Sequence, residues 1–312
     1  MSSRRFFLNQ MGKSLAGISL GVSALPGDLF GRGAFAAQET SSFTILHTND
    51  MHSRIDAFPM DGGRNQGMGG IARRASMIAK VRAETEHVLL LDSGDIFQGT
   101  PYFNFFGGEL ELKVMSELRY DAATLGNHDF DGGMEGLEKN WRHANFPFVS
   151  ANYDFSETLL AGKVSRDVIF EKGPLRIGVF GLGIELDSLV PEKLYGETRY
   201  LDPVLEANAS ALHLKKEMNC DYVICLSHLG YRYRDEKIDD RKLASLTQNI
   251  NLILGGHTHT FLVHPEVIPD VDGQPVMINQ VGWGGLQLGK INVGVEFARR
   301  GRCSSCENLW IT

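Results

Sequence analysis

The sequence predicts an α/β protein, and three observations support this. From Phe43 onward, short apolar runs alternate with amphipathic or polar stretches. Several of these runs end in glycine, aspartate or histidine, as strands of α/β proteins often do. The chain has 312 residues, is 43% hydrophobic, and contains no internal repeat, low-complexity tract or proline-rich linker. One compact domain after the first residues is the simplest organisation.

The predicted strands are the short apolar runs between turn-forming or polar residues. They cover residues 43–47, 88–91, 122–125, 148–151, 175–180, 222–226, 252–254, 276–279 and 290–295. Helices are expected in several of the gaps between them.

Three of these gaps carry helix signals. In the first, one face at i, i+4, i+7 and i+8 spacing is apolar, and it consists of Ile71, Ala75, Ile78 and Ala79. Asp202-Pro203 is typical of an N-cap followed by proline at the first helical position, so a second helix is expected to run to about Met218. A third is expected over about residues 240–248.

The first residues fit an export signal. Residues 3–9, Ser-Arg-Arg-Phe-Phe-Leu-Asn, match the twin-arginine pattern, a mildly apolar stretch follows at residues 15–25, and Ala34-Phe35-Ala36 offers a cleavage site. The apolar stretch is too short and too rich in Gly and Ser to span a bilayer. We therefore expect residues 1–36 to be a removed twin-arginine signal peptide, leaving a periplasmic protein without stable membrane insertion.

The charge balance excludes one class of partner. The formal charge is −7, and residues 1–36 contribute four basic side chains against one acidic, so the rest of the chain carries −10. A surface this acidic is a poor binder of nucleic-acid polymers.

The four cysteines are interpreted mainly as structural. Cys220 and Cys225 flank or lie in an apolar strand and are expected to pack there. Cys303-Ser-Ser-Cys306 is half a zinc knuckle without a second half, so a disulfide or two unreactive thiols is favoured over a zinc or redox site.

Five segments each place a metal-binding side chain just after an apolar run, where α/β sheets present their strand ends to ligands. Any one of them alone could be a turn or a buried histidine. Together they supply oxygen and nitrogen ligands without a thiolate, a set suited to zinc, manganese, iron or cobalt. The candidate ligands are Asp50, His52, Asp95, Asn127, His228, His257 and His259.

These blocks resemble, in the same order, those of the calcineurin-like metallophosphatase superfamily. Residues 46–52, Leu-His-Thr-Asn-Asp-Met-His, and 126–131, Gly-Asn-His-Asp-Phe-Asp, look like signatures of the catalytic domain of bacterial 5′-nucleotidases. The resemblance implies the metallophosphatase fold, a four-layer αββα sandwich with two mixed sheets. It also implies that residues 37–312 form the catalytic domain.

By this resemblance, Asp50, His52 and His259 would hold one divalent ion. Another set, Asn127, His228 and His257, would hold the second, with Asp95 bridging the two. Two ions roughly 3.5 to 4 Å apart can hold a shared hydroxide in line with phosphorus. Histidine at position 259 departs from the glutamine often found in this branch, which could shift the metal preference.

The resemblance also assigns catalytic residues. Asn127 and His128 would contact the substrate, with His128 stabilising the transition state or protonating the leaving oxygen, and Asp131 would orient His128. The alternative for His128 is a packing role. The remaining histidines, for which no catalytic role is expected, are His47, His87, His143, His213 and His264.

Two further features bear on the substrate. Purple acid phosphatases carry tyrosine three positions after the bridging aspartate, where this chain has Gln98, so their iron chemistry is not expected. Phe103, Phe105 and Phe106 could line a substrate pocket, but a core role is favoured.

The predicted function is therefore hydrolysis of phosphate monoesters, with nucleotides as expected substrates, by attack of a metal-bridging hydroxide. The chain ends soon after the metal-binding blocks, so no C-terminal nucleotide-recognition domain is expected, and a separate partner could supply base recognition. Rival hypotheses are a 2′,3′-cyclic nucleotide phosphodiesterase, a broad-specificity phosphatase and a thiosulfohydrolase of sulfur oxidation. A non-enzymatic binding domain is disfavoured because every ligand position is filled.

Overall fold

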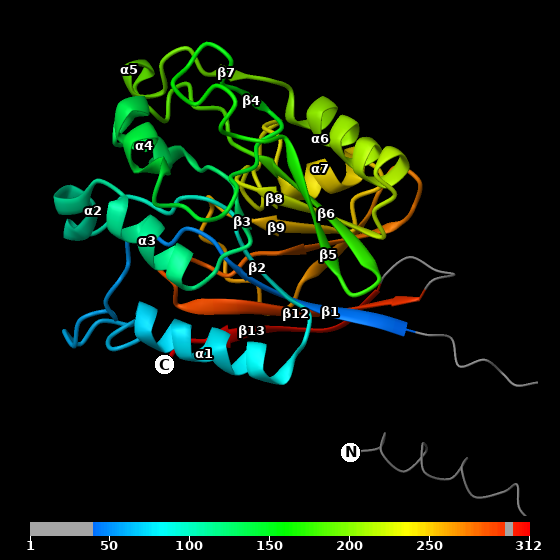
Figure 1. Cartoon of the computed structure of the whole chain (residues 1–312), viewed down its shortest axis with the longest axis horizontal. Helices are drawn as coiled ribbons and strands as arrows, with labels where there is room; N and C mark the ends of the chain where they lie inside the picture. Colours follow the sequence, from blue (N-terminus) through cyan, green and yellow to red (C-terminus); the bar gives the residue numbers. More distant parts are fainter. Residues whose placement is uncertain (1–39, 297–301) are drawn as a thin grey trace, which may run out of the picture. The chain divides into compact units, whose positions relative to one another are not determined.

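Two mixed β-sheets form the centre of the molecule (Figure 1). The computed structural model describes residues 40–296 and 302–312, so the expected signal peptide at 1–36 lies outside the described residues. The first sheet has the order β13-β12-β1-β2-β3, in which β1, β2 and β3 are parallel and β12 is antiparallel to both its neighbours. Its strands are β1 (Thr40–Thr48), β2 (Val88–Asp92), β3 (Ala122–Ala123), β12 (Gln287–Glu296) and β13 (Arg302–Trp310).

The second sheet has the order β10-β11-β9-β8-β6-β5, with parallel pairing from β11 to β6 and an antiparallel strand at each edge. Its strands are β5 (Asp167–Lys172), β6 (Leu175–Leu182), β8 (Tyr222–Ser227), β9 (Leu252–Gly255), β10 (Glu266–Pro269) and β11 (Pro275–Asn279). A separate short pair is formed by β4 (Tyr153–Asp154) and β7 (Arg199–Tyr200).

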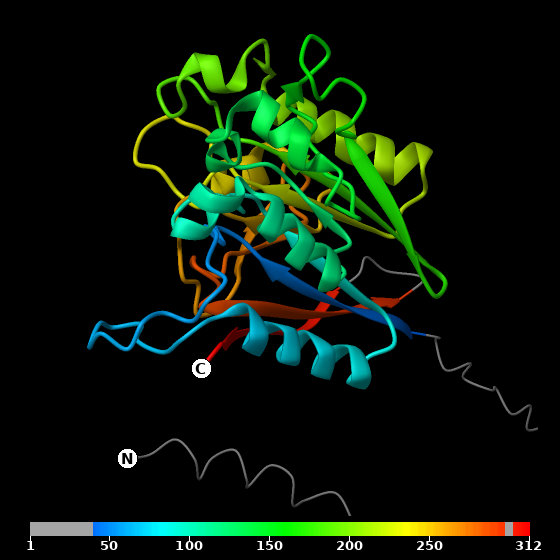
Figure 2. The ribbon, with the colours of Figure 1, turned by 60° about the vertical axis from the view of Figure 1, so that its left-hand side comes forward.

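Helices cover the outer faces of both sheets (Figure 2). Those packed against the first sheet are α1 (Ile71–Glu84), α3 (Glu109–Glu117) and α4 (Gly133–Trp141); those against the second are α6 (Pro203–Leu212) and α7 (Asp240–Leu246). The remaining helical segments are α2 (Pro101–Phe106), η1 (Asn127–Phe130), α5 (Glu192–Tyr195) and η2 (His213–Glu217).

Successive side chains of the central strands point to opposite faces of their sheet, and this produces the layers. In β2, Leu89 and Leu91 join the cluster between the two sheets, whereas Leu90 joins the cluster beneath the helices. Ile45 and Leu46 of β1 divide in the same way. Strands buried on both faces read as continuous apolar runs. The resulting helix, sheet, sheet, helix order confirms the predicted four-layer fold with two mixed sheets.

Most predicted elements form. The exception among the strands is residues 148–151, which make only isolated bridges, from Phe148 to Ala123 and from Val149 to Ser165. Their side chains are nonetheless buried, because an apolar run reports burial and does not guarantee a strand ladder. Asp202 is the predicted N-cap, accepting hydrogen bonds from the backbone N–H groups of Val204 and Leu205 at 2.8 and 3.0 Å.

The three phenylalanines lie on α2, where no helix was predicted. Phe103 packs on the core as expected. The core prediction is wrong for Phe105 and Phe106, whose exposed fractions are 82% and 49%. No residue of this six-residue helix is fully buried, and of its three phenylalanines only Phe103 packs against the core cluster.

The predictions for the cysteines are confirmed in part. Cys220 and Cys225 are buried, the latter within β8, as predicted. Cys306 lies on β13, but the side chain of Cys303 falls outside the described residues, so the pairing of these two stays a prediction. Among the described helices, none combines the length and apolar character needed to cross a membrane.

Candidate metal centre

The candidate ligands lie beyond the carboxyl ends of parallel strands in both sheets. β1 leads to Asp50 and His52, β2 to Asp95, and β3 to Asn127. In the second sheet, β8 leads to His228 and β9 to the two histidines His257 and His259. Because carboxyl ends of parallel strands share one edge of a sheet, the fold gathers side chains that are up to about two hundred residues apart in sequence.

The first group of ligands is Asp50, His52 and His259, whose ligand atoms all lie within 4.8 Å of one another. The two imidazoles approach through their Nε2 atoms at 2.9 Å. Oδ1 of Asp50 is 3.5 Å from His259 Nε2. The structure thus brings together the three residues predicted for one ion.

The second group is Asp95, His228 and His257, within the same 4.8 Å limit. Asn127 joins it, since its Oδ1 lies 2.8 Å from His257 Nδ1. Oδ2 of Asp95 is 3.2 Å from His228 Nε2 and 3.9 Å from His52 Nε2. Asp95 therefore belongs to the second group and also approaches the first.

One buried nitrogen shows that the donor set fits a cation. His228 Nδ1 lies 2.6 Å from the carbonyl oxygen of Ser93, which can only accept, so Nδ1 carries the proton. His228 Nε2 then presents a lone pair, and it is buried without a hydrogen-bond partner among the described residues. It faces the Asp95 carboxylate, another acceptor. Two buried acceptors in contact require a proton or a metal ion between them.

The pKa values of the buried side chains are shifted by burial and by the same close contacts. Burial opposes charge on His228, but the carboxylates of Asp95 and Asp50 outweigh it and raise the pKa to about 10. Burial likewise favours the neutral form of Asp95, yet His228 and His52 lower its pKa. Burial and neighbouring His228 lower the pKa of His257 to about 4, which keeps it neutral, the form that binds metals.

The backbone of the centre is strained. Five of the seven candidate ligands have φ between 48° and 68°, in the left-handed region that non-glycine residues rarely adopt. Such strain costs about 1–3 kcal/mol per residue and concentrates at functional sites. The five residues are Asp50, His52, Asp95, His257 and His259.

Gly126 is required by close approach. A Cβ atom here would lie 2.2 Å from Asp95 Oδ1 and 2.6 Å from His228 Nε2. Only glycine lets the turn before Asn127 pack against these two ligands.

Asp129, for which the sequence predicted no role, holds two ligand loops together. Its buried carboxylate accepts hydrogen bonds from the backbone N–H groups of Asp95, Ile96, Phe97 and Gly126 at 2.8 to 3.1 Å. Burial and the nearby Asp95 raise its pKa, and the backbone donors oppose that rise.

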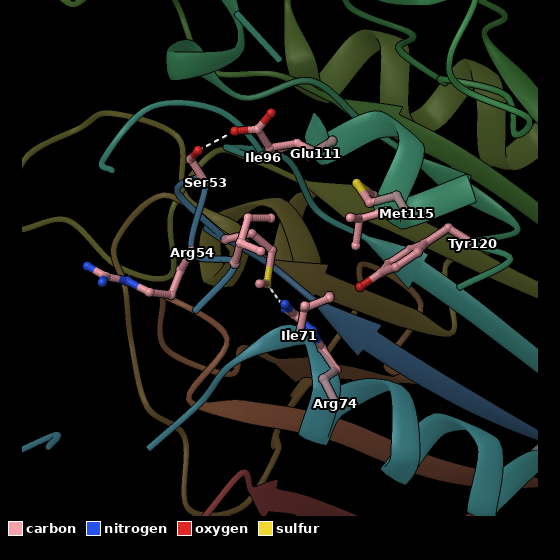
Figure 3. A pocket seen from close by; sticks show the side chains of 11 residues that line it. Ser53, Arg54, Ile71, Arg74, Ile96, Glu111, Met115 and Tyr120 are labelled. Atoms are coloured by element: carbon pink, nitrogen blue, oxygen red, sulfur yellow. Dashed lines mark hydrogen bonds between the residues drawn. The ribbon is translucent and has the colours of Figure 1, made fainter. Parts of the chain in front are cut away.

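A small cavity lies behind the loop that carries His52 (Figure 3). Two buried charged side chains line it: Glu111 accepts a hydrogen bond from Ser53, and Arg74 donates to the sulfur of Met51. Its volume of about 20 Å³ is enough for one water molecule. These contacts fix both neighbours of His52.

His128 and Asp131 form the predicted dyad. His128 Nδ1 lies 2.8 Å from Asp131 Oδ2, and this hydrogen bond raises the pKa of His128. The backbone N–H of His128 donates to Asp95 Oδ1 at 2.8 Å, which places the residue beside the candidate centre. Its side chain is 42% exposed, so a solute can reach it.

The other histidines lie outside the two triads. His47 is buried in β1 and pairs with Asn279, and burial lowers its pKa to about 3. His213 pairs with Glu217 on the protein surface.

Comparison with known proteins identifies the family. The family model described as calcineurin-like phosphoesterase matches residues 43–261. The chain belongs to the calcineurin-like phosphoesterase family. This phosphoesterase is 36% identical over 271 residues to the snake venom 5′-nucleotidase of Crotalus adamanteus, an alignment covering 80% of this chain and 45% of the relative.

Solved structures agree. A 5′-nucleotidase precursor from Thermus thermophilus matches the phosphoesterase with a TM-score of 0.78 and 31% identity, covering 87% of this chain and 55% of that one. The Haemophilus influenzae NAD nucleotidase matches with a TM-score of 0.76 and 25% identity, covering 88% and 51%. The chain thus spans about half the length of these relatives, and the resemblance predicted from its five sequence blocks is confirmed.

Backbone contacts around the phosphoesterase centre carry no sequence signal. The carbonyl oxygen of Ser93 accepts from His228, and that of Gln98 lies 3.2 Å from His52 Nδ1. Trp283, stacked on His259 with ring centroids 5.7 Å apart, also went unassigned. Asp129 does have a sequence signal, because it is an acidic residue inside the block of residues 126–131.

Replacing Asp129 with alanine should loosen both ligand loops. Each buried donor left unsatisfied costs about 1–3 kcal/mol, so we expect Asp129→Ala to lower the free energy of unfolding by on the order of 3 kcal/mol. Asp129→Asn keeps one acceptor oxygen and should lose less. Denaturant unfolding measures both; equal stability of Asp129→Ala and the unmodified protein would contradict this role.

Proposed function

We propose that this chain is a two-metal phosphoesterase that hydrolyses phosphate monoesters, with nucleotides as its substrates. The observation that carries the proposal is the position of Asp95, which belongs to the second triad and lies 3.9 Å from His52 Nε2 of the first. Its carboxylate also faces His228 Nε2, which has no hydrogen-bond partner among the described residues. In this proposal, Asp50, His52 and His259 hold one divalent ion, and Asn127, His228 and His257 hold the other. The ions are zinc, manganese, iron or cobalt.

The charge of the centre suits a phosphate ester. Divalent ions held by these residues would supply Lewis-acid polarisation of the phosphoryl oxygens and would lower the pKa of a bound water. Their charge would exceed that of Asp50 and Asp95 by two, which a phosphate dianion balances. The amide of Asn127 and the ring of His128 lie beside the site of the phosphate dianion and contact the substrate.

His128 supplies the proton. Its Nδ1 is engaged by Asp131, so Nε2 is the atom free to hydrogen-bond the ester oxygen and protonate the leaving group. Asp131 fixes the ring orientation and favours the protonated form. The dyad therefore acts on the leaving group while the seven ligands position the phosphorus.

Replacing His128 separates its role from that of the ligands. General acid catalysis contributes about 10²–10⁴-fold, so His128→Ala should lower kcat by at least about a hundredfold. Asp131→Asn should show a smaller loss. Steady-state kinetics with metal analysis provides the check, and near-normal turnover of His128→Ala with two ions bound would show that the dyad has no catalytic role.

The substrate class is supported by the 5′-nucleotidase relatives. We expect AMP to be hydrolysed with a higher kcat/KM than 2′,3′-cyclic AMP, an aryl phosphate or a carrier-bound sulfur substrate. Preference for the cyclic ester would establish the phosphodiesterase hypothesis, equal rates on all monoesters a broad phosphatase, and activity on the sulfur substrate alone a thiosulfohydrolase. Any of these three results would contradict the nucleotide proposal.

We also propose export through the twin-arginine pathway, on the strength of Arg4 and Arg5 in the residue 3–9 pattern. This route carries folded cargo, so the ions could be loaded before export. In a bacterial host, replacing both arginines with lysine should leave the protein in the cytoplasm at its unprocessed length. Fractionation and immunoblotting test this, and unchanged periplasmic yield would show that the motif is not used.

A further inference from the structure

A second cavity lies next to the candidate centre and has no part in the chemistry described above. It has a volume of about 640 Å³, within the range of small-molecule pockets. Three aromatic rings of α2, those of Tyr102, Phe105 and Phe106, line it, together with the charged side chains of Arg54 and Asp56.

The rings of Phe105 and Phe106 are exposed, and those of Tyr102 and Phe106 make contacts that hold them in place. Tyr102 and Phe106 stack with centroids 6.4 Å apart and planes 20° apart. The Tyr102 hydroxyl donates to Asp56 Oδ2 at 2.7 Å, which ties α2 to the loop after His52. Since Phe105 and Phe106 are not used by the core, their apolar surface is open to a ligand.

Covalent geometry puts this cavity beside the centre. Arg54 follows His52 by two residues, so their Cα atoms are at most about 7.6 Å apart. On the other wall, Thr100 Oγ1 donates to the carbonyl oxygen of Ser53 at 2.8 Å. Figures 1 and 2 both show α2 at the end of the sheets where β1 delivers its ligands.

A row of planar side chains lies between the candidate centre and the cavity. Trp283 stacks on His259 with planes 14° apart, and Phe58 meets Trp283 edge-on at 5.5 Å. The Arg54 guanidinium lies 4.2 Å above the centre of the Phe58 ring. This row runs from a candidate ligand to a residue that lines the cavity.

We propose that this cavity is a subsite for the planar nucleobase of the leaving nucleoside. The inference rests on the proposed phosphoesterase function. Aromatic faces stack on any base, and the Arg54 and Asp56 side chains offer a donor and an acceptor to its polar edge. When the phosphate group of a nucleotide is bound at the ions, its base extends toward α2.

The test uses the full chain loaded with manganese and two substrates, AMP and glycerol phosphate, which lacks a planar group. In the double variant Phe105→Ala/Phe106→Ala, the ratio of kcat/KM for AMP to that for glycerol phosphate should fall about tenfold, the effect of losing one base stack. The matched control is Leu205→Ala on α6, an apolar side chain of 68% exposure on the other outer layer, which should keep the ratio.

A binding measurement separates this inference from the proposed function. Adenosine has no phosphate, so calorimetric titration with adenosine reports the subsite alone, and the double variant should weaken that binding about tenfold. If no phosphoester is hydrolysed but adenosine binding responds as expected, the phosphoesterase proposal fails and the subsite stands.

Three results would overturn the subsite. The first is an unchanged substrate ratio with unchanged adenosine binding in the double variant. The second is an equal loss on both substrates, which would indicate an effect through the centre. The third is loss of self-association in the double variant with adenosine binding intact, which would make the α2 face a protein interface.

Discussion

The centre depends on a buried contact between two hydrogen-bond acceptors. His228 Nε2 and the Asp95 carboxylate lie 3.2 Å apart, and the proton of the imidazole is held on its other nitrogen by Ser93. Such a contact is unfavourable unless a positive charge lies between the two groups. Without an ion, a proton on His228 satisfies it, which explains the raised pKa. With an ion, the same geometry becomes a ligand pair.

The rest of the fold keeps this contact in place. Parallel strands from both sheets end at one edge and deliver the ligands, and glycine at position 126 lets the loops approach closely. Asp129 joins two loops through backbone donors, and five of the candidate ligands have a left-handed backbone conformation. The four-layer core can support this strain because its strands are buried on both faces.

The sequence identified residues that the fold brings together, because each candidate ligand is a polar residue directly after an apolar run, and the topology places the ends of those runs side by side. Prediction from the sequence was less accurate where apolar residues are exposed or are buried without forming a strand. Residues 148–151 are buried without forming a strand, and Phe105 and Phe106 are apolar yet exposed. Contacts made by carbonyl oxygens, such as that of Ser93, depend on backbone conformation and cannot be predicted from the residue type.

In the proposed centre, Asp95 joins two cations. Anomalous diffraction from crystals grown with excess manganese tests it most directly. We expect two manganese peaks, one among Asp50, His52 and His259 and one among Asn127, His228 and His257, with a carboxylate oxygen of Asp95 in contact with both. A single peak, no peak, or two peaks that Asp95 does not touch would contradict it.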